Sequence, residues 1–295
     1  MLSITFLKLI NEFMEERKIH LSVSEMLSRA FNLCKNNVLE ILKVIGIFIV
    51  PTIVVLFGVI IGIVFSSLIN ISYSYSYSYS YFDEAIPFIG IGTIFLIILI
   101  ALISSVLMLY ANGIITKILD DANKGNEVSW RSANKYVWKR KWSILGLNIL
   151  VWLMTFAFVV VIALLTMLLA LLTVGIGLII LIPLIIAIIV ILTPLTSLFT
   201  SMLIVRDLTI TEAIGETFML FKKGYFWSTI GKLAAISGIT IAIGLVLAII
   251  QVIPLVGIVI AIIGQYSIQA YTISYLNILS LDRSNIVENF IDPIM

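Results

Sequence analysis

Charged residues are scarce in this chain of 295 residues. Lys, Arg, Asp and Glu make up 12% of it, hydrophobic residues make up 61%, and the mean hydropathy is +1.20. Soluble domains carry about 25% charged and about 45–50% apolar residues. The composition therefore cannot supply the polar surface that a soluble enzyme, a nucleic-acid-binding protein or a disordered scaffold needs. It predicts an integral membrane protein.

Side chains that carry catalysis are also nearly absent. The chain has one histidine, His20, and one cysteine, Cys34. Zinc sites and acid–base catalysis need clustered His, Cys, Asp or Glu, and an intramolecular disulfide needs two cysteines. Phosphate-binding and dinucleotide-binding glycine motifs are missing as well. We therefore expect no catalytic residue, no metal and no cofactor, and we predict that the protein is not an enzyme.

Four long stretches without charge predict the membrane spans. These stretches are 44–82, 85–116, 142–205 and 233–281. A helix needs about 20 apolar residues to cross the hydrocarbon layer, and unpaired backbone groups exclude open strands there. The predicted fold is all-α integral membrane, with six transmembrane helices. They lie near 44–69, 86–116, 143–172, 177–204, 228–252 and 255–279.

The basic residues indicate how these helices are oriented. All 18 Lys and Arg lie before or at the start of the first helix, between the second and third, near the fourth-to-fifth connection, or after the sixth. Six helices place all of these segments on one side, which the positive-inside rule makes cytoplasmic. We predict a multi-pass protein of the cell (inner) membrane with both termini in the cytoplasm. Asp83 and Glu84 are then the only charges outside.

Two segments flank or interrupt this membrane domain of residues 21–281. Residues 1–20 place apolar side chains on one helical face, which is typical of an amphipathic helix on the inner membrane surface. The outer loop repeats Ser-Tyr from Ser72 to Tyr81. We interpret it as a low-complexity linker, with a β-pairing segment as the alternative. Residues 282–295 form a short cytoplasmic tail.

A repeated amphipathic helix precedes the transmembrane pairs. Residues 21–36 (LSVSEMLSRAFNLCKN) align without a gap with residues 208–223 (LTITEAIGETFMLFKK). In both copies a Ser or Thr stands three residues before a Glu, the spacing of a capping box that starts a helix. A fainter copy at 128–140 (VSWRSANKYVWKR) places Tyr136 opposite Phe31.

Each copy of this helix is followed by two spans. The sequence therefore predicts three parallel repeats of an interfacial helix and a transmembrane hairpin, at about 21–119, 120–205 and 206–281. Several alternating-access transporters use inverted repeats instead, although parallel repeats also occur. Asn37 and Gly224 follow the first and last copies, where a left-handed residue often ends a helix.

Two groups of polar residues are candidate binding sites. Basic residues that close the interfacial helices are candidates for contact with lipid headgroups: Lys35, Lys139, Arg140, Lys141, Lys222 and Lys223. Neutral polar residues on the last two spans are candidates for a polar cavity: Gln251, Gln265, Gln269 and Tyr266. Hydrogen bonds between helices are the simpler interpretation of the second group.

One segment resembles a known pattern. From Thr193 to Gly231, a proline-bearing span leads through an interfacial helix into the step Lys223-Gly224-Tyr225-Phe226-Trp227. This stretch resembles a broad group of poorly characterised prokaryotic polytopic membrane proteins. The group includes the membrane domain attached to some bacterial glycerophosphoryl diester phosphodiesterases. The resemblance implies a structural motif without catalytic residues, and no soluble segment here is long enough to form the phosphodiesterase domain.

These observations favour a non-enzymatic membrane protein with a structural, lipid-associated or partner-assisting role. The expected partners are membrane lipids, above all anionic headgroups of the cytoplasmic leaflet, and no nucleic acid; the sequence does not identify a protein partner. The alternative is a transporter or exporter of a hydrophobic or amphiphilic solute. That alternative predicts a polar cavity around Gln265 and Gln269.

Overall fold

The computed structural model describes residues 21–51, 54–55, 57–58, 61–62, 85–173, 178–221, 226–253 and 256–282. Helix makes up 90% of the structure, and the described residues contain no strand. The all-α prediction is therefore confirmed. The predicted N-terminal helix at 1–20, the Ser-Tyr repeat and residues 283–295 lie outside the described residues.

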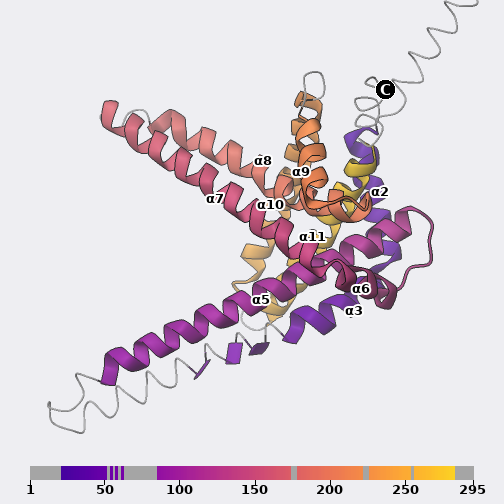
Figure 1. Ribbon diagram of the computed structural model, residues 1–295, viewed down its shortest axis with the longest axis horizontal. Helices are drawn as coiled ribbons and strands as arrows, with labels where there is room; N and C mark the ends of the chain where they lie inside the picture. The colour runs from indigo at the N-terminus through magenta and orange to yellow at the C-terminus, as the bar shows by residue number, and fades with distance from the viewer. Residues whose placement is uncertain are drawn as a thin grey trace, which may run out of the picture. The chain divides into compact units, whose positions relative to one another are not determined.

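The chain consists of short and long helices (Figure 1). The short ones are α2 (Val23–Asn36), α3 (Val38–Val44), a π-helical turn (Ile45–Ile49), α6 (Trp130–Lys139) and α9 (Ile210–Met219). The long ones are α5 (Ala85–Asn123), α7 (Lys141–Leu172), α8 (Leu178–Val205), α10 (Phe226–Ile250) and α11 (Val256–Asp282). Each long helix overlaps one of the predicted spans, and α5 continues beyond its predicted end at residue 116 to Asn123. Of the remaining predicted span, 44–69, residues 52–53, 56, 59–60 and 63–69 lie outside the described residues.

Three segments of the described chain are long and apolar enough to cross a membrane. They are Ile98–Asn123, Lys141–Leu169 and Phe226–Ile250. On α7 the buried side chains, Ile144, Leu147 and Val151, all come from its first three turns, whereas Trp152 and most later residues are exposed. A large exposed apolar surface of this kind is unfavourable in water and suited to lipid. These helices indicate a membrane protein.

The connections between the long helices lie where apolar helices are expected to end. α7 ends at Leu172 and α8 begins at Leu178, close to the predicted span bounds of 172 and 177. α10 ends at Ile250, and α11 begins at Val256, two residues after Pro254. Proline removes a backbone donor and is tolerated best near a helix start. Pro183 and Pro194, in contrast, lie inside α8.

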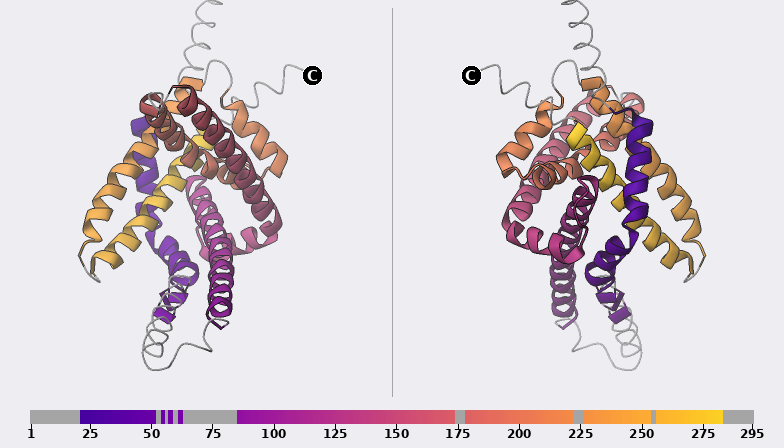
Figure 2. Two further views of the ribbon diagram at one scale, coloured as in Figure 1. Left: turned by 90° about the vertical axis from the view of Figure 1, so that its left-hand side faces the viewer. Right: turned by 90° about the vertical axis from the view of Figure 1, so that its right-hand side faces the viewer.

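The chain divides into two compact units. One comprises Leu42–Asn112, and the other contains residues 21–41 and the described chain from Gly113 onwards. In the larger unit α11 packs against α2, α8 and α10, and α8 packs against α7, α9 and α10. Figure 2 shows the α10–α11 pair side by side. Fully buried side chains of this unit, such as Met26, Leu198 and Tyr275, come from different helices and form a shared core.

Candidate membrane-interface site

Capping boxes start two of the short helices, as the sequence predicts. In α2 the Ser22 hydroxyl accepts the Glu25 N–H at 3.2 Å, and the Ser22 N–H donates to Glu25 Oε2 at 2.8 Å. In α9 the same pair of bonds joins Thr209 and Glu212. The hydrogen bonds from Ser22 and Thr209 lower the pKa of both glutamates. Each carboxylate thus stays ionised at the positive end of its helix.

Helix α6 forms a set with α2 and α9, and we call these the three short helices. It begins differently. Its N-cap is Ser129, whose side chain makes no capping bond. Instead, the Trp130 N–H donates to the Glu40 carboxylate of α3 at 2.9 Å. An acceptor 90 residues away therefore satisfies the start of α6.

Counted from their N-caps, the three short helices bury the same positions. The fourth and eighth residues are buried in each: Met26 and Ala30 in α2, Ala133 and Val137 in α6, Ala213 and Thr217 in α9. The ninth residue is an exposed aromatic, with exposed fractions of 60% for Phe31, 60% for Trp138 and 48% for Phe218. The sequence alignment had placed Tyr136 opposite Phe31. That register was wrong by two residues, because α6 begins only after Ser129.

The end of α2 also differs from the prediction. Asn37 is the C-cap residue, but its φ of −113° is not left-handed. Its side-chain amide donates to the Leu33 carbonyl at 2.8 Å. The amide thus satisfies one of the helix's last carbonyls without a backbone reversal, because the chain continues directly into α3. Gly224 lies outside the described residues.

Helices α9 and α6 contact the long helix that comes just before each of them, and α2 packs on the last long helix. α9 contacts α8, where the rings of Phe199 and Phe218 meet edge to face with centroids 5.9 Å apart. α6 lies against the end of α5, where the Lys117 ammonium is 4.9 Å from the centroid of the Tyr136 ring. α2 contacts α11, where Ser274 Oγ donates to the Ala30 carbonyl at 3.3 Å. The contact of α11 with α2 joins the last helix to the first described one.

Three of the predicted headgroup-contact residues lie at the surface near the exposed aromatics. Lys35 and Lys139 are exposed, and Lys141 is half-buried. The Lys141 ammonium lies 4.3 Å from the ring centroid of Trp138 and 5.9 Å from that of Trp142, both largely exposed. This arrangement places a cation between two aromatic rings. Lys222 and Lys223 lie outside the described residues.

Arg140, the fourth described residue of that group, points into the protein. Its guanidinium donates to the carbonyls of Leu203 (2.9 Å), Asp207 (3.2 Å) and Leu208 (3.2 Å), and it pairs with the Asp207 carboxylate at 3.0 Å. The Lys124 ammonium donates to the Val205 carbonyl at 2.8 Å. The negative end of α8 thus receives two cations.

The same cluster includes Tyr136. Its hydroxyl donates to Asp207 Oδ1 at 2.6 Å. Burial, reinforced by this hydrogen bond, raises the pKa of Tyr136 to about 12. The phenol therefore stays protonated at any physiological pH, and it acts as a fixed hydrogen-bond donor to the α8–α9 turn.

A buried ion pair lies at the end of α11. Lys232 Nζ of α10 is 2.7 Å from Asp282 Oδ2, and the two side chains are 6% and 1% exposed. The other carboxylate oxygen, Asp282 Oδ1, accepts the Leu21 N–H at 2.8 Å. Sequence reasoning missed this pairing because Lys232 and Leu21 are 50 and 261 residues from Asp282.

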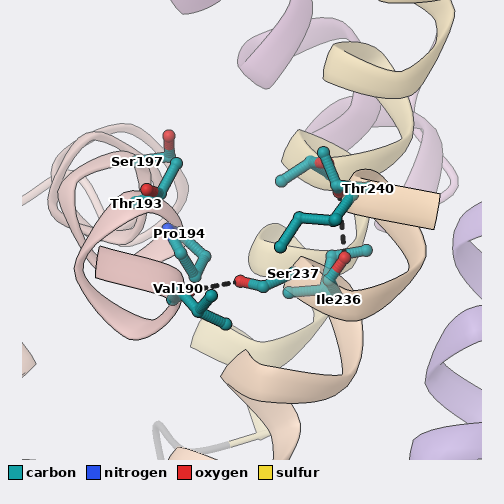
Figure 3. Close-up of a pocket in the computed structure, with 9 residues that line it drawn as sticks. Val190, Thr193, Pro194, Ser197, Ile236, Ser237 and Thr240 are labelled. Atoms are coloured by element: carbon teal, nitrogen blue, oxygen red, sulfur yellow. Dashed lines mark hydrogen bonds between the residues drawn. The ribbon is translucent and has the colours of Figure 1, made fainter. Parts of the chain in front are cut away.

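The four neutral polar candidates differ in their exposure. Gln251 and Gln265 are exposed, Gln269 is half-buried and Tyr266 is buried. A pocket of about 210 Å³ lies elsewhere, between α8, α10 and α11 (Figure 3), and none of these four residues lines it. Its lining residues are Val190, Thr193, Pro194, Ser197, Ile236, Ser237, Thr240, Ile241 and Thr272.

Within the described residues, no group of three or more His, Cys, Asp or Glu side chains could hold a metal ion. No protein family, curated protein or solved structure matches the chain. The resemblance of residues 193–231 to other prokaryotic membrane proteins therefore stays a prediction from the sequence.

Proposed function

We propose that this protein is a non-enzymatic, six-span protein of the cell (inner) membrane that binds anionic lipid headgroups at the cytoplasmic leaflet. Its role is structural, in organising the membrane or supporting a partner protein. The observation that most directly supports this proposal is an exposed aromatic residue nine positions after each N-cap: Phe31 on α2, Trp138 on α6 and Phe218 on α9.

Exposed aromatics on half-packed helices suit the membrane–water interface. An aromatic ring in water forfeits the free energy of burial, whereas Trp and Phe at headgroup level bury their rings among acyl chains. The opposite face of each short helix is packed against protein. The aromatic face is therefore the one available to the bilayer.

The packing supports three parallel units, about 21–119, 120–205 and 206–281. α9 packs on α8 and α2 packs on α11, so the second helix of one hairpin supports the interfacial helix of the next unit. The helices α5, α7, α8, α10 and α11 contain 39, 32, 28, 25 and 27 residues. Each exceeds the ~20 residues that a crossing needs. With the predicted first span, both termini lie in the cytoplasm.

The basic residues provide the attraction to anionic headgroups. Lys35 and Lys139 are exposed, and Lys141 lies over the exposed Trp138 ring. A basic residue beside an anionic leaflet contributes about 1 kcal/mol. Arg140 is left out of this surface because its guanidinium binds the end of α8.

The test compares lipid binding by the full chain and by the variant Lys35→Gln/Lys139→Gln/Lys141→Gln. Binding of phosphatidylglycerol and of phosphatidylcholine to the purified protein is measured in detergent by native mass spectrometry. We expect the wild-type chain to prefer phosphatidylglycerol. Each neutralised lysine should reduce that preference about fivefold, the equivalent of about 1 kcal/mol.

A second pair of variants tests the aromatic contact. Trp138→Ala should weaken binding of both lipids because it removes an interfacial ring. Trp152→Ala removes an even more exposed ring from the lipid-facing surface of α7 and should leave the headgroup preference unchanged. Equal affinity of the wild-type chain for both lipids, or an unchanged preference in the triple lysine variant, contradicts the proposal.

Transport of a hydrophobic or amphiphilic solute is the second candidate function. The observation that favours it is the pocket between α8, α10 and α11. A flux assay in vesicles, with the chain inserted and a fluorescent amphiphile inside, tests it. Chain-dependent efflux supports transport, and efflux equal to that of empty vesicles argues against it.

A further inference from the structure

The pocket lies within the apolar part of the larger unit. Its walls come from the middle of α8, from one face of α10 and from Thr272 of α11 (Figure 3). α10 is one of the three helices able to cross a membrane. Thr193 and Ile241 line the pocket and are themselves exposed. The pocket is therefore open to the outer surface of the helices.

One wall of the pocket depends on a proline. Pro194 has no N–H, so the Val190 carbonyl one turn earlier in α8 lacks its usual helical donor. Ser237 Oγ of α10 donates to this carbonyl at 2.5 Å, as Figure 3 shows. The bond satisfies a backbone group that would otherwise be unpaired in an apolar region. It also ties α10 to α8 beside the pocket.

Two further hydroxyl groups that line the pocket, those of Thr240 on α10 and Thr272 on α11, also form hydrogen bonds within the protein. Thr240 Oγ1 donates to the Ile236 carbonyl at 2.9 Å and lies 3.3 Å from Thr272 Oγ1. No charged residue lines the pocket. Because these hydroxyls already bond within the protein, the surfaces of Pro194 and Ile241 offer a ligand mainly carbon atoms. The chemistry suits a neutral, apolar ligand.

The size of the pocket suits the same class of ligand. Its volume of about 210 Å³ exceeds the ~150 Å³ of an apolar cavity that stays free of water and admits benzene. An unfilled pocket of this size forfeits the dispersion contacts of its lining atoms. The molecules that surround a membrane-spanning helix are lipids, whose acyl chains are flexible enough to enter from the side.

We propose that this pocket binds one acyl chain of a membrane lipid, between α8 and α10. The proposal rests on the membrane location given under the proposed function, but it does not depend on the headgroup. A chain seated there contacts Pro194 and Ile241 and covers the Ser237–Val190 bond. The bound lipid then acts as a fixed part of the α8–α10 packing.

The test uses a phosphatidylcholine that carries a diazirine in one acyl chain. The full chain is reconstituted with this lipid and irradiated, and the attachment sites are located by mass spectrometry. We expect attachment to concentrate on the pocket residues of α8 and α10. The variant Ser197→Phe, which fills the pocket, should lower attachment there about tenfold, equivalent to about 1.4 kcal/mol.

The control Val161→Phe adds the same ring to the exposed surface of α7 and should leave attachment at the pocket unchanged. If Ser197→Phe fails to fold, Ser197→Leu fills less of the pocket and should give a smaller reduction. Attachment spread evenly over exposed residues of α7 and α10, or unchanged by a folded pocket-filling variant, overturns the proposal.

The outcome separates this proposal from the headgroup proposal. If phosphatidylglycerol is not preferred but diazirine attachment still concentrates at the pocket, the headgroup proposal fails and the acyl-chain proposal stands. If phosphatidylglycerol is preferred and attachment is diffuse, the reverse holds. A chain that alkaline carbonate removes from the vesicles contradicts both proposals.

Discussion

At the residue scale, two charged side chains complete helices to which they do not belong. Glu40 of α3 accepts the first N–H of α6, and Arg140 donates to the Leu203 carbonyl in the last turn of α8. Every helix leaves unpaired backbone groups at its two ends, and these groups need hydrogen-bond partners. Acidic side chains suit the positive end of a helix, and basic side chains suit its negative end. In α6 and α8, residues far away in the sequence provide some of these partners.

Cys34 provides a test at this scale. Burial raises the pKa of its thiol to about 11, although a hydrogen bond with Ser274 offsets part of the effect. At pH ~8 it should therefore hold about 200-fold less thiolate than a thiol with a pKa of about 8.5. We expect slow alkylation by iodoacetamide at that pH and a rate that rises as the pH approaches 11.

The matched control moves the thiol by one residue. In Cys34→Ser/Lys35→Cys, the cysteine occupies an exposed position of the same helix and should react quickly at pH ~8. Alkylation is followed by mass spectrometry on the full chain in detergent. Equal rates for the two thiols at that pH would show that Cys34 is not protected.

At the scale of the element, the three short helices share a burial pattern but not their N-terminal caps. α2 and α9 carry their own capping boxes, whereas α6 depends on Glu40. A capping box involves residues three apart, so the sequence alone predicts it. The start of α6 is visible only in the fold, and for that reason the predicted register of its aromatic residue was wrong.

This difference in capping predicts different effects of two similar substitutions on stability. Thr209→Ala removes the side-chain cap of α9 and should reduce the free energy of unfolding by about 1 kcal/mol. Ser129→Ala at the N-cap of α6 should change it little, because the Ser129 side chain makes no capping bond. Chemical unfolding of the full chain in micelles gives both values.

Hydrogen exchange locates the effect. The amides at the start of α9 should exchange faster in Thr209→Ala, while those of α6 should be unchanged in Ser129→Ala. Equal losses of stability in the two variants would mean that the capping box does not stabilise α9.

At the scale of the whole molecule, Asp282 joins the last described helix to the start of α2. Its carboxylate binds the Lys232 ammonium and the Leu21 N–H. Desolvation makes a buried ion pair weak evidence for stability, but the loss of one partner leaves an uncompensated charge. The pair therefore favours this arrangement of helices chiefly because any other arrangement would leave a buried charge without its partner.

Two variants separate the charge from the hydrogen bond. Asp282→Asn keeps an acceptor for Leu21 but leaves the Lys232 ammonium without its carboxylate, which should cost about 3–5 kcal/mol. Lys232→Met/Asp282→Asn removes both charges and should recover much of that loss. Lys139→Met, at an exposed residue, is the control. The explanation fails if Asp282→Asn unfolds at the same denaturant concentration as the wild-type chain.

What the sequence by itself determined depends on neighbouring residues. The apolar stretches predicted the bounds of α7, α8, α10 and α11 within three residues and the start of α5 within one, although α5 continues to Asn123. They could do so because a helix forms its backbone hydrogen bonds within its own segment. The capping boxes at Ser22 and Thr209 were predictable for the same reason.

The tertiary structure alone decided which residues meet across the fold. Arg140 bonds to carbonyls more than 60 residues away, and Lys232 and Leu21 meet at Asp282. The pocket lies beside Pro194, not around Gln265 and Gln269. Helical periodicity says which side chains share a face of one helix, but their neighbours depend on how the helices pack, and that packing brings together residues far apart in the chain.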